Sequence, residues 1–149
     1  MLAGYTQKET DRENFETCKR IAQELEAFAE GRYIKCPECG EWIEAPEDDD
    51  EKITCPECGE TIDADEAECS SIYDYFDNTE LYDIEYTCGS KKEYRGVRLM
   101  VACGGPNIYI DTMEKAVKLY WWTDRAEYAL LSDTVEAIDQ YFEELFECC

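Results

Sequence analysis

The chain has 149 residues, of which 37 are acidic and 14 basic, so its formal net charge at pH 7 is −23; it contains ten cysteines and no histidine. The absence of histidine excludes Ser-His-Asp and Cys-His nucleophiles and an imidazole general base. The charge argues against direct binding to nucleic acid or an anionic membrane, because phosphate recognition depends on Lys and Arg. No apolar run approaches the roughly 20 residues of a membrane span, and the first nine residues lack the regions of a signal peptide. We therefore expect a cytoplasmic protein whose cysteines are metal ligands or buried thiols rather than disulfides.

The first segment, residues 1–32, is expected to be a helix. Its apolar residues recur at three- and four-residue steps between Thr6 and Glu30, which predicts one apolar stripe on an amphipathic helix. The stripe comprises Phe15, Cys18, Ile21, Ala22, Leu25, Phe28 and Ala29. Gly31 is the expected C-terminal stop. The pattern indicates a helix that packs against the rest of the protein.

The second segment, residues 33–66, contains an internal repeat. Residues 36–40 and 55–59 both have the sequence Cys-Pro-Glu-Cys-Gly, and a short extended stretch lies before and after each copy. The four cysteines Cys36, Cys39, Cys55 and Cys58 have the C-x2-C…C-x2-C spacing of a zinc site. A two-residue gap lets both sulfurs of a turn face one point, and two such turns supply a tetrahedron of thiolates. The segment is too poor in apolar residues to fold on its own core, so metal binding would supply most of its folding free energy.

The two Cys-Pro-Glu-Cys-Gly turns resemble the knuckles of zinc ribbons and rubredoxins. The resemblance implies that Cys36, Cys39, Cys55 and Cys58 are the ligands, with zinc as the expected metal and iron as the less favoured one. Many ribbons bind nucleic acid through basic residues. Here residues 41–68 hold thirteen acids and a single base, Lys52, so we expect no nucleic-acid binding. Four closed sulfur ligands leave no open position for catalysis, which favours a structural role and a protein that is not an enzyme.

The third segment, residues 67–149, alternates apolar and polar residues and predicts a four-stranded antiparallel meander followed by a C-terminal helix. The expected strands run through Tyr82–Cys88, Val97–Cys103, Ile108–Ile110 and Val117–Trp122, with turns at 89–92, 104–107 and 112–115. The helix is expected to begin near Ser132, where Asp133 and Glu136 have capping-box spacing. The predicted fold class is therefore α+β: an N-terminal helix, a zinc ribbon, and a meander with a covering helix.

Six further cysteines fit no second metal site by their spacing. Cys18, Cys88 and Cys103 fall on predicted apolar faces, where a free thiol behaves as a small hydrophobe. The other three are Cys69, Cys148 and Cys149. We expect no function from this group.

The acids are too numerous to be explained by solubility alone, because self-repulsion of this size opposes compaction. B-form DNA carries about one negative charge per 1.7 Å of axis, and a folded surface of Asp and Glu can approach that density. Such a surface would occupy the basic groove of a nucleic-acid-binding protein, with an exposed aromatic as an anchor. The candidate partner-binding residues are Glu47, Asp48, Asp49, Asp50, Glu51, Asp74, Asp77, Trp122, Glu143 and Glu144.

In size, charge and lack of enzyme motifs the chain resembles small acidic proteins of phages and mobile elements, namely DNA-mimic anti-restriction proteins and anti-CRISPR proteins. Two stretches, residues 104–111 and 117–122, are also similar to small acidic proteins of gut-bacterial mobile elements. The resemblance implies a non-catalytic inhibitor in the bacterial cytoplasm, with a partner such as a Cas nuclease. Two other functions stay open: a zinc-ribbon adaptor between proteins, and a rubredoxin-like iron electron carrier.

Overall fold

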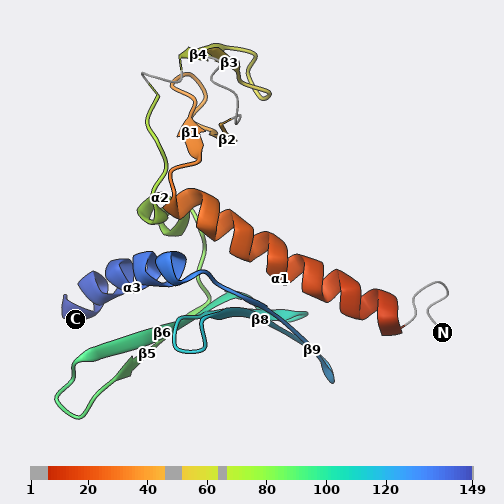
Figure 1. Ribbon diagram of the computed structural model, residues 1–149, viewed down its shortest axis with the longest axis vertical. Helices are drawn as coiled ribbons and strands as arrows, with labels where there is room; N and C mark the ends of the chain where they lie inside the picture. Colours follow the sequence, from red (N-terminus) through yellow and green to blue (C-terminus); the bar gives the residue numbers. More distant parts are fainter. Residues whose placement is uncertain (1–6, 46–51, 64–66, 149) are drawn as a thin grey trace. The chain divides into compact units, whose positions relative to one another are not determined.

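A computed structural model describes residues 7–45, 52–63 and 67–148. The chain forms two compact units, one from Met1–Glu26 together with Thr79–Cys149 and the other from Ala27–Asn78. The described residues form three helices and nine strands, and every strand pairing is antiparallel (Figure 1). The mixed α and β class expected from the sequence is confirmed. The number of strands differs from the prediction.

Helix α1 spans Gln7–Ala29 and contributes residues to both units. Most of its predicted apolar stripe is buried, with Cys18 and Leu25 fully buried and Ile21 nearly so, whereas Phe15 is 42% exposed. The predicted stop, Gly31, lies two residues after the last residue of α1, and its φ of 75° is in the left-handed region that glycine adopts without strain. The N–H of Arg32 then donates a 2.9 Å hydrogen bond to the Ala27 carbonyl, which satisfies one of the last carbonyls of the helix.

The smaller unit contains two short antiparallel hairpins whose sequences resemble each other. Strand β1 (Tyr33–Lys35) pairs with β2 (Trp42–Glu44), and β3 (Lys52–Thr54) pairs with β4 (Thr61–Asp63). In both hairpins two isoleucines are opposite each other, Ile34 with Ile43 and Ile53 with Ile62. The buried cluster between the hairpins consists of two isoleucines and two cysteines: Ile34, Ile62, Cys36 and Cys55. This core is small, as expected for a segment that depends on a metal.

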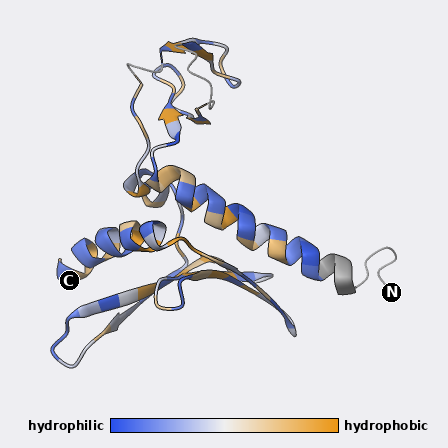
Figure 2. Cartoon of the chain, viewed as in Figure 1, coloured by the Kyte–Doolittle hydropathy of each residue, from blue (hydrophilic) through white to orange (hydrophobic). Residues whose placement is uncertain are grey.

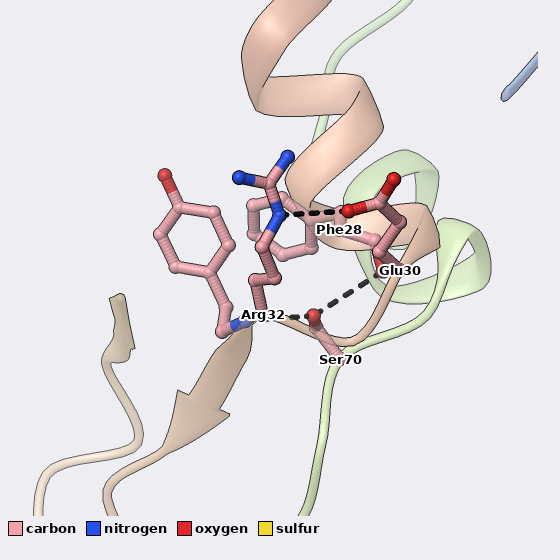
Figure 3. A network of polar contacts seen from close by, with 5 residues as sticks. Phe28, Glu30, Arg32 and Ser70 are labelled. Carbon is pink, nitrogen blue, oxygen red and sulfur yellow. Dashed lines mark hydrogen bonds and ion pairs between the residues drawn. The ribbon is translucent and has the colours of Figure 1, made fainter. Parts of the chain in front are cut away.

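Ser70 joins three parts of the smaller unit through one hydroxyl group. Its Oγ donates to the carbonyl of Phe28 at 3.2 Å and accepts from the backbone N–H of Tyr33 at 3.2 Å (Figure 3). Beside it, the guanidinium Nε of Arg32 lies 3.0 Å from the carboxylate of Glu30. The rings of Phe28 and Tyr33 stack with centroids 4.5 Å apart. These contacts fix the end of α1 against β1.

The larger unit contains one sheet of five strands in the order β5-β6-β7-β8-β9. The strands are β5 (Asp83–Cys88), β6 (Tyr94–Ala102), β7 (Asn107–Asp111), β8 (Ala116–Trp121) and β9 (Asp124–Ala129). The predicted four-stranded meander is wrong by one strand, because β9 was not recognised. Asp124, Ala126 and Tyr128 are the half-buried residues of β9 and alternate with exposed ones, and with one acid among them the sequence is too polar to stand out as a strand.

One face of this sheet carries the core. Val97, Leu99, Ile110, Val117 and Leu119 are all almost completely buried. Helix α3 (Ser132–Glu147) packs against β6 and buries Ile138 and Phe142. Phe15 of α1 lies 5.6 Å from Tyr128 of β9, measured between ring centroids. Figure 2 shows hydrophilic and hydrophobic residues interspersed along α1 and α3, as expected for helices with one buried side.

Helix boundaries show two further differences from the sequence analysis. The Asp133/Glu136 capping box is wrong: α3 has Leu131 as its N-cap and no side-chain capping bond. A contact of this kind occurs instead at α2 (Ile72–Asp77), an unpredicted helix too short to show periodicity, where the Ser71 N–H donates to the Asp74 carboxylate at 2.8 Å. Within the residues described, no helix combines the length and the hydropathy that a membrane span requires.

Candidate metal centre

Four cysteine sulfurs converge between the two hairpins of the smaller unit. The Sγ atoms of Cys36, Cys39, Cys55 and Cys58 all lie within 4.8 Å of one another. The closest sulfurs come from different turns: Cys36 and Cys58 are 3.6 Å apart, and so are Cys39 and Cys55. Every predicted ligand is therefore brought to one point, and the four cysteines can hold a metal ion.

The sulfur separations fit a tetrahedral metal ion. Metal–sulfur bonds of about 2.3 Å place tetrahedral sulfurs about 3.8 Å apart, close to the 3.6 Å of the two cross-turn pairs. A disulfide would need a separation of about 2.05 Å, and these four cysteines are free thiols. The sulfur cluster thus has the size of a four-thiolate site.

The backbone of each turn explains how the sulfurs are positioned. Gly40 and Gly59, which follow the second cysteine of each turn, both have a φ of 78°. Their N–H groups donate to the carbonyls of Cys36 and Cys55, at 2.9 and 2.8 Å. A Cβ atom at either glycine would meet no atom within 4 Å. The glycines are therefore needed for their left-handed backbone conformation and not for space.

The four ligands are related in pairs. Cys36 and Cys55, the first cysteine of each turn, are buried, whereas Cys39 and Cys58, the second, are exposed. This twofold arrangement follows from the sequence repeat, because equal turns place equal residues at equal depth. One side of the site therefore rests on the isoleucines of the small core, and the other faces solvent.

Packing four thiols together has a clear effect on their acidity. A hydrogen bond from the backbone N–H of Cys39 lowers the pKa of Cys36 to about 7. The backbone N–H of Glu60 lowers the pKa of Cys58 as well, but burial and the neighbouring sulfurs outweigh it and raise that pKa to about 12. One thiol ionises easily and a second resists, because unshielded thiolates repel each other. A cation at the centre removes this repulsion.

The cysteines outside the cluster divide differently from the prediction. Cys18 is fully buried in α1, as expected for a small apolar side chain. Cys88 and Cys103 are exposed, so their predicted burial is wrong. Cys88 lies at the end of the edge strand β5, and Cys103 lies beyond the end of β6. Nearly all of β5 is exposed, and Cys103 follows the last residue of β6, so neither thiol reaches the core.

The acidic residues are unevenly distributed over the elements. The sheet region, residues 83–129, has seven acidic and seven basic residues, whereas α3 has six acids and no base. Five of the acids of α3 are exposed, and four of them are separated by three, seven and four residues while Glu144 adjoins Glu143: Asp133, Glu136, Glu143, Glu144 and Glu147. They form a row along the outer side of α3, which we call the α3 carboxylate row. Two of them, Glu143 and Glu144, were predicted to bind a partner.

The other predicted partner-binding residues have varied surroundings. Residues 47–51, which are Glu47, Asp48, Asp49, Asp50 and Glu51, lie outside the described part of the chain. Asp74 accepts hydrogen bonds from both the N–H and the hydroxyl of Ser71, and Asp77 is exposed at the end of α2. The neighbouring Tyr75 and Phe76 are buried and so offer no exposed ring beside these two acids.

Trp122 does not lie on a strand, contrary to the prediction. Strand β8 ends at Trp121, which pairs with Asp124, so Trp122 occupies the two-residue turn between β8 and β9. Its φ is 56° and it is 91% exposed.

The sequence analysis did not predict a contact between an arginine and a tyrosine on the sheet. Arg98 on β6 places its guanidinium carbon 4.0 Å from the ring centroid of Tyr109 on the neighbouring strand β7. Residue alternation along each strand could have placed both on the face opposite the core, but only the strand register brings them together.

No family model, curated protein or solved structure matches this chain.

Proposed function

We propose that this protein is a non-catalytic binding protein with a structural zinc ion, and that it inhibits a nucleic-acid-binding protein by occupying its basic groove. The proposal has two parts, a metal that holds the smaller unit together and an acidic surface that binds the partner. The observation that carries the second part is the α3 carboxylate row. It is an ordered line of acids on a helix without a single Lys or Arg.

Zinc is the metal that the ligand set favours. Four thiolates in a tetrahedron select zinc or iron among the common metals, and a site with four protein ligands is closed to substrate. Around the two cysteine turns, the buried hydrophobic cluster consists of Ile34 and Ile62 beside the ligands Cys36 and Cys55. A metal that ties the hairpins together therefore supports folding rather than a reaction.

Metal content decides between zinc and iron. Purified protein expressed with both metals present is expected to contain one zinc per chain by elemental analysis and to be colourless. Red protein with one iron per chain would support an electron carrier instead. The exposed Cys39 and Cys58 would then offer a path for electrons to the surface.

The dimensions of the α3 carboxylate row support the binding role. Fourteen residue steps separate Asp133 from Glu147, and at 1.5 Å per residue they span about 21 Å. One strand of B-form DNA places about six phosphates along that length. The five exposed carboxylates of the row therefore approach the charge density of a single phosphate backbone. A groove lined with Lys and Arg would be attracted over long range and with a fast on-rate.

The partner class follows from this chemistry. A groove that accepts such a row is one built for polynucleotide, as in a restriction enzyme or a Cas nuclease. Occupying it would block the enzyme without any covalent step. On this proposal the protein is an inhibitor of host defence with anti-restriction or anti-CRISPR activity, and it acts in the bacterial cytoplasm.

A competition experiment tests the proposal. The immobilised, metal-loaded protein is incubated with bacterial lysate that has been treated with nuclease, and bound proteins are eluted with duplex DNA. We expect nucleic-acid-binding proteins to be captured and to be displaced by DNA, with binding that weakens steeply as salt is raised. Captured proteins that DNA does not displace, or that stay bound at high salt, would overturn the mimicry.

A matched pair of variants locates the binding surface. In the first, Glu143→Gln and Glu144→Gln remove two charges from the α3 carboxylate row. In the second, Glu114→Gln and Glu127→Gln remove two exposed charges from the electroneutral sheet region. The net charge is the same in both, so a weaker capture by the first variant alone assigns binding to α3. Equal weakening would mean that overall charge, and no particular surface, is responsible.

A further inference from the structure

Trp122 is held in a conformation that folding alone does not explain. It occupies the first position of the two-residue turn between β8 and β9 with a φ of 56°, in the left-handed region that suits glycine or asparagine. Its side chain is 91% exposed. A large indole therefore sits in a strained turn without being buried. Such strain persists where the side chain serves a purpose other than packing.

The indole borders a hollow on the open face of the sheet. The hollow has a volume of about 300 Å³ and is lined by Gly104, Gly105, Asn107, Tyr120, Trp121 and Trp122. Trp121 lies against the turn before β7, since a Cβ atom on Gly105 would come within 2.8 Å of its ring. Tyr120 and Asn107 are paired across β8 and β7. The residues that line the hollow are therefore three aromatic side chains, two glycines and an asparagine, and none of them is Lys, Arg, Asp or Glu.

The same sheet already binds a guanidinium group on an aromatic ring. The Arg98 guanidinium carbon lies 4.0 Å from the centroid of Tyr109. Tyr109 in turn lies edge-on to Tyr120, with centroids 5.9 Å apart. Tyr109 therefore has an arginine of its own chain over its ring. No such cation lies over Tyr120 or Trp122 in the described part of the structure.

Resting on the binding function proposed above, we infer that Trp122 and Tyr120 form a stacking site for an arginine side chain of the basic partner. The net charge of −23 attracts a basic partner to the protein at long range, and tryptophan is the best aromatic acceptor for a cation. A guanidinium also matches the flat rings by stacking, which an ammonium cannot do. Tyr120 also borders a second hollow, which Lys118, Arg125, Ala126 and Glu127 line, so the partner's arginine is placed on the Trp122 side of Tyr120, away from Lys118 and Arg125.

Peptides that differ only in their cation test this site. Metal-loaded protein is titrated with hexa-arginine and with hexa-lysine at the same ionic strength, for the wild type and for Trp122→Gly. We expect the wild type to prefer hexa-arginine and Trp122→Gly to lose about two- to fivefold of that preference, the size of an exposed cation–π contact. Glycine suits the positive φ, so the variant should unfold at the same or a higher temperature than the wild type.

Two controls separate stacking from charge. Trp122→Phe keeps an aromatic face and should retain part of the arginine preference. Leu131→Ala removes another exposed apolar side chain, one that lies outside the hollow, and should leave the preference unchanged. Equal preference in the wild type and Trp122→Gly would overturn the stacking site while leaving the acidic binding function intact. Failure of both peptides to bind would overturn the binding function itself.

Discussion

The hydroxyl of Tyr94 on β6 donates a 2.6 Å hydrogen bond to Oδ1 of Asp139 on α3. Burial, followed by the contact with Asp139, raises the pKa of Tyr94 far above its ordinary value. The phenol therefore keeps its proton throughout the physiological range. Around it, the rings of Tyr86 and Phe146 lie 5.2 Å apart, and those of Tyr94 and Phe146 lie 5.9 Å apart. This bond and its ring cluster attach the C-terminal helix to the sheet.

Tyr94→Phe should destabilise the protein by about 1–2 kcal/mol, because Asp139 loses its donor in a partly buried place. Asp139→Asn should cost less, since its amide oxygen can still accept the bond. Chemical denaturation followed by circular dichroism measures both. Tyr82→Phe on the exposed edge of the sheet is the control and should change little. Equal effects of Tyr94→Phe and Tyr82→Phe would contradict a special role for this contact.

Loss of a single ligand should abolish tight metal binding. We expect Cys36→Ser and Cys55→Ser, at the two buried positions, to lower zinc affinity by orders of magnitude and to unfold the hairpins of the smaller unit, because metal binding and folding are coupled there. Zinc per chain after dialysis and the NMR signals of Ile34 and Ile62 report on both effects. Cys88→Ser and Cys103→Ser lie outside the cluster and should keep one zinc per chain. A Cys36→Ser protein that retains its zinc would show that the four sulfurs are not the ligand set.

Acidification should release the metal. Protons compete with the metal for thiolates, so affinity falls as pH falls. The lowered pKa of Cys36, about 7, means that this sulfur is the easiest to keep as a thiolate. Cys58, whose pKa is raised to about 12, depends most on the metal to stay ionised. Zinc release measured with a chromogenic chelator should therefore increase steadily from pH 7 to pH 4, and release that did not vary with pH would count against thiolate ligands.

Alkaline pH should destabilise the protein through Cys18. Burial, with a further contribution from the Glu127 carboxylate, raises the pKa of Cys18 to about 11, whereas an unfolded cysteine has a pKa of about 8.5. Below pH 8.5 the thiol is neutral in both states, so stability is unaffected. Between these two values the unfolded chain loses the proton first, so stability falls as pH rises.

Cys18→Ala removes this dependence. Its free energy of unfolding should decline less steeply between pH 8.5 and 11 than that of the wild type. Cys88→Ala, at an exposed thiol, should decline as steeply as the wild type. Urea titrations at several pH values provide the comparison. Identical slopes for the wild type and Cys18→Ala would contradict the raised pKa.

The sequence was informative where the determining interactions are local. The ligands Cys36, Cys39, Cys55 and Cys58 are fixed by two five-residue turns, and each turn needs only its own glycine and backbone hydrogen bonds. Helix α1 is long enough for its periodicity to repeat several times. These features could be predicted because few residues, close in the chain, determine them.

The features that were missed depend on residues distant in the chain. Strand β9 exists because its backbone pairs with β8, although its own side chains are mostly polar or small. Cys88 is exposed because β5 is an edge strand with nearly all of its residues exposed, and Cys103 is exposed because it lies beyond the end of β6. A single stretch of sequence does not show which strand will pair with it or which of its residues will be buried.

By itself, then, the sequence determined the metal site, the first helix and the acidic character, since chelate spacing, helical periodicity and charge are properties of short segments or of composition. Only the tertiary structure decided that the sheet region is electroneutral while α3 carries a row of carboxylates, and that Trp122 stands in a strained turn beside Tyr120. The physical reason is that strand register and helix packing, which involve the whole chain, determine which side chains are buried and which meet solvent.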